Sequence, residues 1–107
     1  MTGKSSDPQS GAGVLERQRE KTETPRLYRV LLINDDYTTM EFVVSVLEGV
    51  FQKSPAEAFR IMMRVHTQGQ AACGVYTYEV AETKVATVRD LAASRGFPLQ
   101  ATIEEDT

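Results

Sequence analysis

Two spacings of apolar residues divide most of the chain into six segments. The alternation or continuous apolar character of strands covers three segments: residues 27–34, 71–78 and 99–104. Apolar positions three and four residues apart, typical of helices, cover three others: residues 39–51, 55–68 and 79–95. The order β-α-α-β-α-β predicts a small α+β domain, with a three-stranded antiparallel sheet and helices packed on one face.

Capping residues predict where the helices begin and end. Thr38 and Glu41 have the spacing of a capping box, so the first helix is expected to start about one residue after Thr38. Ser54 is expected to cap the second helix, with the side chain of Glu57 reaching back to it. Glycine in a left-handed conformation commonly ends a helix, and two glycines follow the predicted second and third helices: Gly69 and Gly96.

Hydrogen-bond acceptors directly follow the first strand, as Asn34, Asp35 and Asp36. On the second helix, Met62 and His66, the only histidine, are four residues apart and so share a face. An amide oxygen, carboxylates and a neutral imidazole accept hydrogen bonds from a cation. Methionine adapts to apolar groups of different shapes. The pattern therefore suggests a site for a ligand with a cationic head and an apolar body, such as a peptide N-terminus with a bulky apolar first residue.

Simpler interpretations of the same residues stay open at this point. Asparagine and aspartate are common in turns because they accept local backbone hydrogen bonds, and methionines at helical spacing commonly fill a core. A metal site is disfavoured because adjacent carboxylates in a turn diverge and the chain has no second histidine. No serine or cysteine lies in a nucleophile motif. We therefore expect no metal, no cofactor and no enzymatic activity, and we interpret Cys73 as a small buried residue in a strand.

Composition narrows the class of protein further. The 107 residues allow one domain, and their formal charge of −3 disfavours a nucleic-acid partner, which requires a clustered basic face. A single cysteine excludes an internal disulfide and favours a reducing compartment. No apolar stretch approaches the roughly 20 residues of a membrane span. We expect a cytoplasmic monomer. Residues 1–25 hold few large apolar side chains and are predicted to be a disordered extension, with the domain at residues 26–107.

Several short motifs, taken together, resemble one known family. They are residues 32–38 (LINDDYT), 40–43 (MEFV), 65–66 (VH), 73–77 (CGVYT), 79–85 (EVAETKV) and 98–99 (PL). Over about residues 26–104 the chain is similar to the ClpS family. The resemblance implies a bacterial adaptor that binds N-degrons, meaning substrates with an N-terminal Leu, Phe, Tyr or Trp. It implies delivery of these substrates to the N-terminal domain of ClpA, the unfoldase of the ClpAP protease.

The resemblance also assigns roles to individual residues. Asn34 and His66 match the groups that hold the α-amino group, with Asp35 and Asp36 as the acidic pair beside it. Met40 matches the gate that rejects β-branched first residues. The side-chain pocket is matched by seven residues: Leu32, Thr38, Met40, Val43, Met62, Val65 and Leu99. The surface that docks on the unfoldase is matched by Tyr76, Glu79 and Lys84.

The chain departs from the family pattern at three positions. Thr39 stands where proline is common, which is expected to loosen the start of the first helix slightly, with Thr38 still available as its cap. Phe97 and Ala101 stand where a histidine and a cysteine are common, and both flank Leu99 in the expected pocket. The rival interpretation is a protein-interaction domain of ribosomal-stalk type, which would have a similar topology and no ligand pocket.

Overall fold

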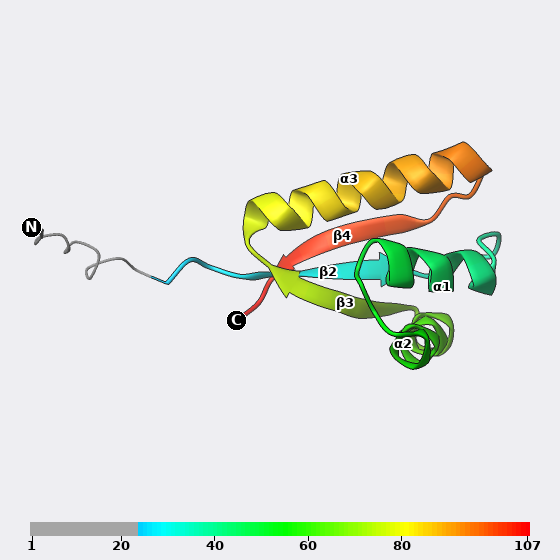
Figure 1. Cartoon of the computed structure of the whole chain (residues 1–107), viewed down its shortest axis with the longest axis horizontal. Helices are drawn as coiled ribbons and strands as arrows, with labels where there is room; N and C mark the ends of the chain where they lie inside the picture. The colour runs from blue at the N-terminus through cyan, green and yellow to red at the C-terminus, as the bar shows by residue number, and fades with distance from the viewer. Residues whose placement is uncertain (1–23) are drawn as a thin grey trace, which may run out of the picture.

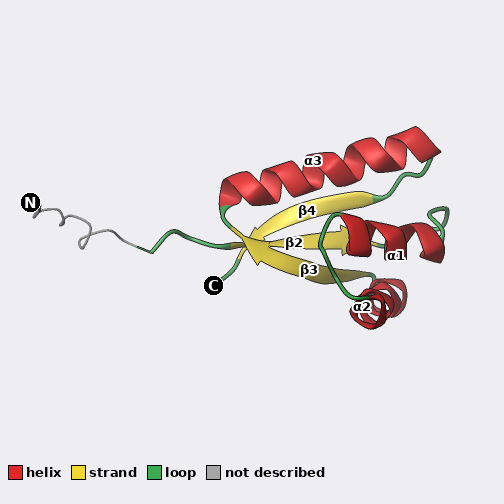
Figure 2. Ribbon diagram, viewed as in Figure 1, coloured by secondary structure: helices red, strands yellow, loops and turns green. Residues whose placement is uncertain are grey.

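The computed structural model describes residues 24–107. Its elements follow the predicted order: β2 (Tyr28–Ile33), α1 (Met40–Gly49), α2 (Pro55–Gln68), β3 (Gln70–Tyr76), α3 (Tyr78–Arg95) and β4 (Gln100–Glu105) (Figures 1 and 2). The predicted fold class, α+β with the order β-α-α-β-α-β, is confirmed. The disordered extension was predicted for residues 1–25, and residues 1–23 of it lie outside the described part of the chain.

The sheet places the first strand in the middle. Its order is β3-β2-β4, and β2 runs antiparallel to both neighbours. Leu32 pairs with Ala71 of β3 and with Ala101 of β4. A central strand forms hydrogen bonds along both edges. The segment that follows β2 therefore starts from a strand that is held on both sides.

One face of the sheet carries the core. Val30 and Leu32 of β2 are fully buried there, whereas Leu31 points to the other face and lies outside the core cluster. Helix α3 packs along β4 and β2, α2 packs against β3, and α1 packs against α2 (Figure 1). The helices thereby cover the face that their apolar periodicity predicted.

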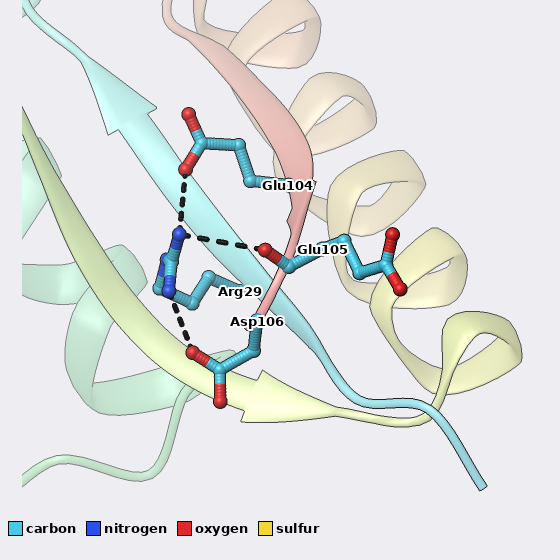
Figure 3. A network of polar contacts seen from close by, with 4 residues as sticks. All are labelled: Arg29, Glu104, Glu105 and Asp106. Atoms are coloured by element: carbon cyan, nitrogen blue, oxygen red, sulfur yellow. Dashed lines mark hydrogen bonds and ion pairs between the residues drawn. The ribbon is translucent and has the colours of Figure 1, made fainter.

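The opposite face carries a polar cluster at the start of β2. Figure 3 shows the Arg29 guanidinium donating to the carboxylates of Glu104, at 2.9 Å, and Asp106, at 2.6 Å. It also donates to the backbone carbonyl of Glu105, at 3.4 Å. These bonds join β2 to the last residues of β4 and extend the pairing of the two strands at the end of the chain.

The cap of α1 differs from the prediction. The Thr39 hydroxyl accepts a hydrogen bond from the Phe42 N–H at 3.1 Å, whereas the Thr38 hydroxyl donates to the Asp35 carboxylate at 2.7 Å. The expected capping box of Thr38 and Glu41 is therefore wrong, because the Thr38 hydroxyl is bound elsewhere. Thr39 supplies the cap itself, so the departure from proline at this position does not leave the helix start open.

The other helix ends follow the prediction more closely. Ser54 caps α2 by accepting from the Glu57 N–H at 3.2 Å. The Glu57 carboxylate pairs with Arg60 instead of reaching back to Ser54, because the longer side chain finds a cation one turn along the helix. Gly69 and Gly96 end α2 and α3 in left-handed conformations, with φ of 92° and 76°.

Two boundaries near α3 were predicted a little differently. Thr77 takes the extended N-cap geometry, so Tyr78 opens α3, whereas the sequence pattern placed it at the end of β3. Leu99 was predicted in the last strand, but it precedes β4 and is buried in the core. Neither shift changes the face on which the neighbouring residues lie.

The Thr39 cap predicts a loss of stability on truncation. Thr39→Ala should lower the free energy of unfolding by about 1 kcal/mol, because the Phe42 N–H loses its partner, while Thr39→Asp should retain the cap. Urea denaturation measures both. Thr67→Ala is the matched control: its hydroxyl bonds only to the Met63 carbonyl within α2, so it should change stability by less than about 0.5 kcal/mol. Equal losses at Thr39 and Thr67 would contradict the capping role.

Candidate functional site

Three segments meet at the end of the sheet that lies away from the C-terminus: the residues after β2, the first turn of α1 and the last turn of α2 (Figure 1). A backbone hydrogen bond from the Asn34 N–H to the Gly69 carbonyl, at 2.9 Å, ties the end of β2 to the end of α2. His66 lies in the last turn of that helix. The bond therefore brings Asn34 and His66, 32 positions apart in the chain, to the rim of one site.

A cavity of about 210 Å³ lies between these segments. Its lining consists of nine residues, all of them among the predicted site residues: Asn34, Asp35, Asp36, Thr38, Met40, Val43, Met62, Val65 and His66. Val43, Met62 and Val65 are almost completely buried and form the apolar wall, while Asn34, Asp36 and His66 are exposed. The cavity is thus apolar inside and polar at its mouth.

Two predicted pocket residues lie elsewhere. Leu32 is fully buried in the core and does not line the cavity. Leu99 is also buried and lines a separate cavity together with Phe97 and Ala101. The two leucines belong to the same buried cluster as the apolar wall of the cavity, and the departures at Phe97 and Ala101 line the separate cavity.

The two neighbouring aspartates have different surroundings. Asp35 accepts hydrogen bonds from the Tyr37 N–H at 2.8 Å, the Thr38 N–H at 2.7 Å and the Thr38 hydroxyl at 2.7 Å. Burial raises the pKa of Asp35, but these hydrogen bonds lower it, and the net shift is downward from 3.8. Within residues 24–107, no hydrogen bond or ion pair engages the Asp36 carboxylate, which remains available as an acceptor.

The predicted docking residues form a second region. The Lys84 ammonium lies 5.3 Å from the centre of the Tyr76 ring and donates to the Val50 carbonyl at 2.6 Å and to Gln52 at 3.1 Å. Lys84 thus binds the segment that follows α1 by two hydrogen bonds, and its side chain is half-buried. Glu79 is exposed.

Glu79 and Lys84 line a larger groove of about 800 Å³ between α1 and α3. This groove was not predicted from the sequence. Its signal in the sequence was two apolar residues of α3, Val80 and Leu91, which are not among the buried residues of that helix and are exposed by 43% and 42%.

The site offers acceptors and an apolar wall, and the described residues place no nucleophile in it. Cys73 is buried in β3, and burial raises its pKa to about 12, so its thiol stays protonated. In the part of the chain that the structure describes, no three His, Cys, Asp or Glu side chains are grouped to hold a metal ion. None of the described helices is long and apolar enough to cross a bilayer.

Comparison with known proteins decides the family. The family model "ATP-dependent Clp protease adaptor protein ClpS" matches residues 23–102. The chain belongs to the ClpS family. The ClpS protein of Maricaulis maris (strain MCS10) is 57% identical over 98 residues, which are 92% of this chain and 90% of that protein. The ClpS protein of Desulfatibacillum aliphaticivorans is 55% identical over 103 residues, 95% of this chain and 99% of that protein.

A solved structure of the family supports the same conclusion. ClpS2 of Agrobacterium tumefaciens, bound to L-phenylalaninamide, matches with a TM-score of 0.75 at 44% identity, covering 78% of this chain and all of that one. The predicted membership of the ClpS family is confirmed, and the chain is an adaptor of a Clp protease. Family membership favours this over the rival ribosomal-stalk interpretation.

The hydrogen bonds to Asp35 predict a pH-dependent contribution to stability. Because the folded-state pKa lies below the ordinary 3.8, ionised Asp35 stabilises the fold above that value, and this contribution is lost as the pH falls through the lower, folded-state pKa. We expect Asp35→Asn to be less stable than the wild type near pH 7, with the difference shrinking below about pH 4.

Urea denaturation at a series of pH values measures the difference. Asp90→Asn is the control, because Asp90 is exposed on α3 and no hydrogen bond or ion pair within residues 24–107 engages its carboxylate, so its effect should not change across that range. An Asp35→Asn difference that stays constant down to about pH 2.5 would contradict the stabilising role of the ionised carboxylate.

Proposed function

We propose that this adaptor recognises N-degron substrates by their first residue and delivers them to the ClpA unfoldase of the ClpAP protease. The observation that carries the proposal is the cavity of about 210 Å³ with exposed acceptors at its mouth and buried apolar side chains inside. Its chemistry fits an α-ammonium group joined to a Leu, Phe, Tyr or Trp side chain. The ligand of the related ClpS2, L-phenylalaninamide, combines a free α-amino group with a benzyl group.

The mouth of the cavity suits an ammonium group. An N-terminal ammonium has a positive charge and three donors, which an internal amide lacks. The side-chain oxygen of Asn34, the carboxylate of Asp36 and an imidazole nitrogen of His66 are exposed acceptors around one opening. Hydrogen bonds of this kind are charge-assisted and about twice as strong as neutral ones.

The magnitudes require both halves of the ligand. Burying a large apolar side chain contributes about 1.5–3 kcal/mol, and two or three charge-assisted bonds contribute about 1.5–3 kcal/mol each. Association costs at least about 4 kcal/mol. The difference allows dissociation constants down to about 1 μM. A ligand that lacks the ammonium group, or one that lacks the large apolar side chain, would bind only weakly.

Met40 suits the role of a selective gate. It is the first residue of α1, is exposed by 44% and lies at the rim of the cavity. The apolar wall below it contains Val43, which is nearly buried. A thioether at the rim leaves room for an unbranched Cβ of the first residue and collides with a second substituent on that carbon. The proposal therefore includes exclusion of N-terminal Ile and Val.

Delivery requires a second surface, away from the pocket. Tyr76, Glu79 and Lys84 lie beside the groove between α1 and α3 and would contact the N-terminal domain of the unfoldase. The extension at residues 1–25 would enter the unfoldase channel, because its composition offers little apolar surface to pack. The adaptor would act as a monomer in the bacterial cytoplasm, without a cofactor, a nucleic acid or a membrane.

Acetylating the ligand tests the proposed function directly. A labelled peptide that begins with Phe should bind at least about tenfold more tightly than the same peptide with an acetylated N-terminus, because acetylation removes the charge and two donors. Fluorescence anisotropy measures both affinities, and a peptide that begins with Ala is the control for the side chain. Equal binding of the free and acetylated Phe peptides would refute recognition of the ammonium group.

Truncating Met40 should relax the selection of the first side chain. Met40→Ala should admit peptides that begin with Ile or Val, raising their affinity at least about tenfold, while a Leu peptide loses less than that. The physical reason is the removal of the side chain that meets the second substituent on Cβ. Val44→Ala, one turn further along α1 and absent from the cavity lining, is the matched control. Continued rejection of Ile by Met40→Ala would remove Met40 from the gate.

Deletion of the N-terminal extension should separate delivery of the substrate to the protease from binding of its N-terminus. Deleting residues 1–24 should leave peptide affinity within about twofold and should abolish degradation of an N-degron reporter by ClpAP. A chain with the same residues in scrambled order should retain most of the delivery, because we expect the length and composition of this extension to matter more than its residue order. Full degradation with the truncated adaptor, or lost peptide binding on truncation, would overturn this division.

A further inference from the structure

The acidic pair at the mouth of the cavity does not consist of two equivalent ligands. Asp35 Oδ1 accepts from the N–H groups of Tyr37 and Thr38, and Asp35 Oδ2 accepts from the Thr38 hydroxyl. An ionised carboxylate has about four lone-pair positions, and three of these are filled by its own loop. Little acceptor capacity remains for a ligand.

Asp36 has the opposite arrangement. Its side chain is exposed at the same cavity, and across residues 24–107 no donor is bound to it. Consecutive side chains of a turn point in different directions, so the bonds that hold Asp35 into the loop leave Asp36 facing outward. Of the two carboxylates, Asp36 is the one that can approach an ammonium group.

The loop that Asp35 shapes lies between two fixed points. Before it, the Asn34 N–H is bound to the Gly69 carbonyl at 2.9 Å. After it, Thr39 caps α1 and makes Met40 the first helical residue. The length and shape of the loop therefore set the distance from the acceptor on Asn34 to the thioether of Met40.

Two cavities adjoin this loop. The pocket of about 210 Å³ and a second cavity of about 390 Å³ are both lined by Asn34, Asp35 and Asp36, and the second is also lined by Pro98 and Gln100. Fewer side chains pack against a segment that borders cavities, so its own hydrogen bonds contribute more to fixing its conformation. The three bonds to Asp35 are the ones that the structure provides within the loop.

We propose that Asp35 is a positioning residue that sets the spacing between Asn34 and Met40, and with it the selection of the first side chain, whereas Asp36 supplies the charge that attracts the ammonium group. This inference rests on the proposed function. It changes the assignment that the family resemblance gives to Asp35, from a group beside the amine to the internal brace of the loop.

Two ratios of affinities separate the roles. The first, the amine ratio, compares a peptide that begins with Leu with the same peptide whose α-amino group is replaced by hydrogen. The second, the branching ratio, compares peptides that begin with Leu and with Ile. A substitution that only destabilises the fold lowers the affinities for all peptides by the same factor. Both ratios then stay unchanged, which distinguishes such an effect from a change in recognition.

Substitution by the isosteric amide tests the charge. Asp36→Asn should lower the amine ratio by about tenfold or more, because the neutral amide loses a charge-assisted bond. Asp35→Asn should lower it by less than about threefold, since the amide oxygen still accepts from both backbone N–H groups and the NH₂ group can donate to the Thr38 hydroxyl. Asp90→Asn, far along α3, is the control. Equal losses of the amine ratio at Asp35 and Asp36 would overturn the proposal.

Truncation tests the positioning. Asp35→Ala removes all three bonds and should lower the branching ratio by about fivefold or more, whereas Asp36→Ala should leave it within about twofold. Should Asp35→Ala fail to fold, Thr38→Val, which removes only the hydroxyl bond, serves in its place, with Thr38→Ser as the rescue. A branching ratio that neither Asp35→Ala nor Thr38→Val changes would refute the positioning role. Failure of the proposed function would give a different result: the wild-type protein would have an amine ratio near one, because it would bind the two Leu peptides equally.

Discussion

The hydrogen bond from the Asn34 N–H to the Gly69 carbonyl is the constraint on which the site depends. It joins the end of the central strand to the left-handed residue that closes α2, where φ is 92°. A residue with a Cβ is strained in that conformation, so glycine allows the helix to end where the carbonyl can meet Asn34. The bond places an acceptor from the strand beside His66 from the helix, although the two are remote in the sequence.

The cavity draws its apolar wall from the core of the domain. Val43, Met62 and Val65 belong to the same buried cluster as Leu32 of the central strand. Side chains in such a cluster are held by close packing, so the wall is already formed before a ligand arrives. The polar mouth, in contrast, is built on a loop that two cavities adjoin. Close packing fixes the wall of the cavity, and hydrogen bonds within the loop fix its rim.

Helix α1 separates the two surfaces that an adaptor needs. Met40 and Val43 line the cavity of about 210 Å³, whereas Phe42 and Val46 line the groove toward α3. Residues three or four positions apart share a face of a helix, and residues two positions apart, such as Met40 and Phe42, are separated by about 200° around its axis. A substrate in the cavity and a partner along the groove would thus contact different sides of the same short helix. Lys84 lines the groove and donates to the Val50 carbonyl just beyond α1. It thereby links the groove to the C-terminal end of α1.

The amino-acid sequence was sufficient to predict the features that depend on near neighbours in the chain. The apolar spacings predicted six elements and their order, and Ser54, Gly69 and Gly96 marked helix ends where the structure has them. Short motifs identified the family, which the comparisons confirm. These features are local because capping, turn formation and amphipathic periodicity each involve residues within one or two turns of one another.

The contacts between distant segments became known from the folded domain. It set the strand order β3-β2-β4, which no pattern along the chain encodes. It gave the cap of α1 to Thr39, because the Thr38 hydroxyl is drawn to Asp35. It buried Leu32 and Leu99 in the core and left them out of the lining of the cavity that they were expected to line. The physical reason is competition: each donor, acceptor and apolar surface has several possible partners in the sequence, and only the packed chain determines which partner it meets.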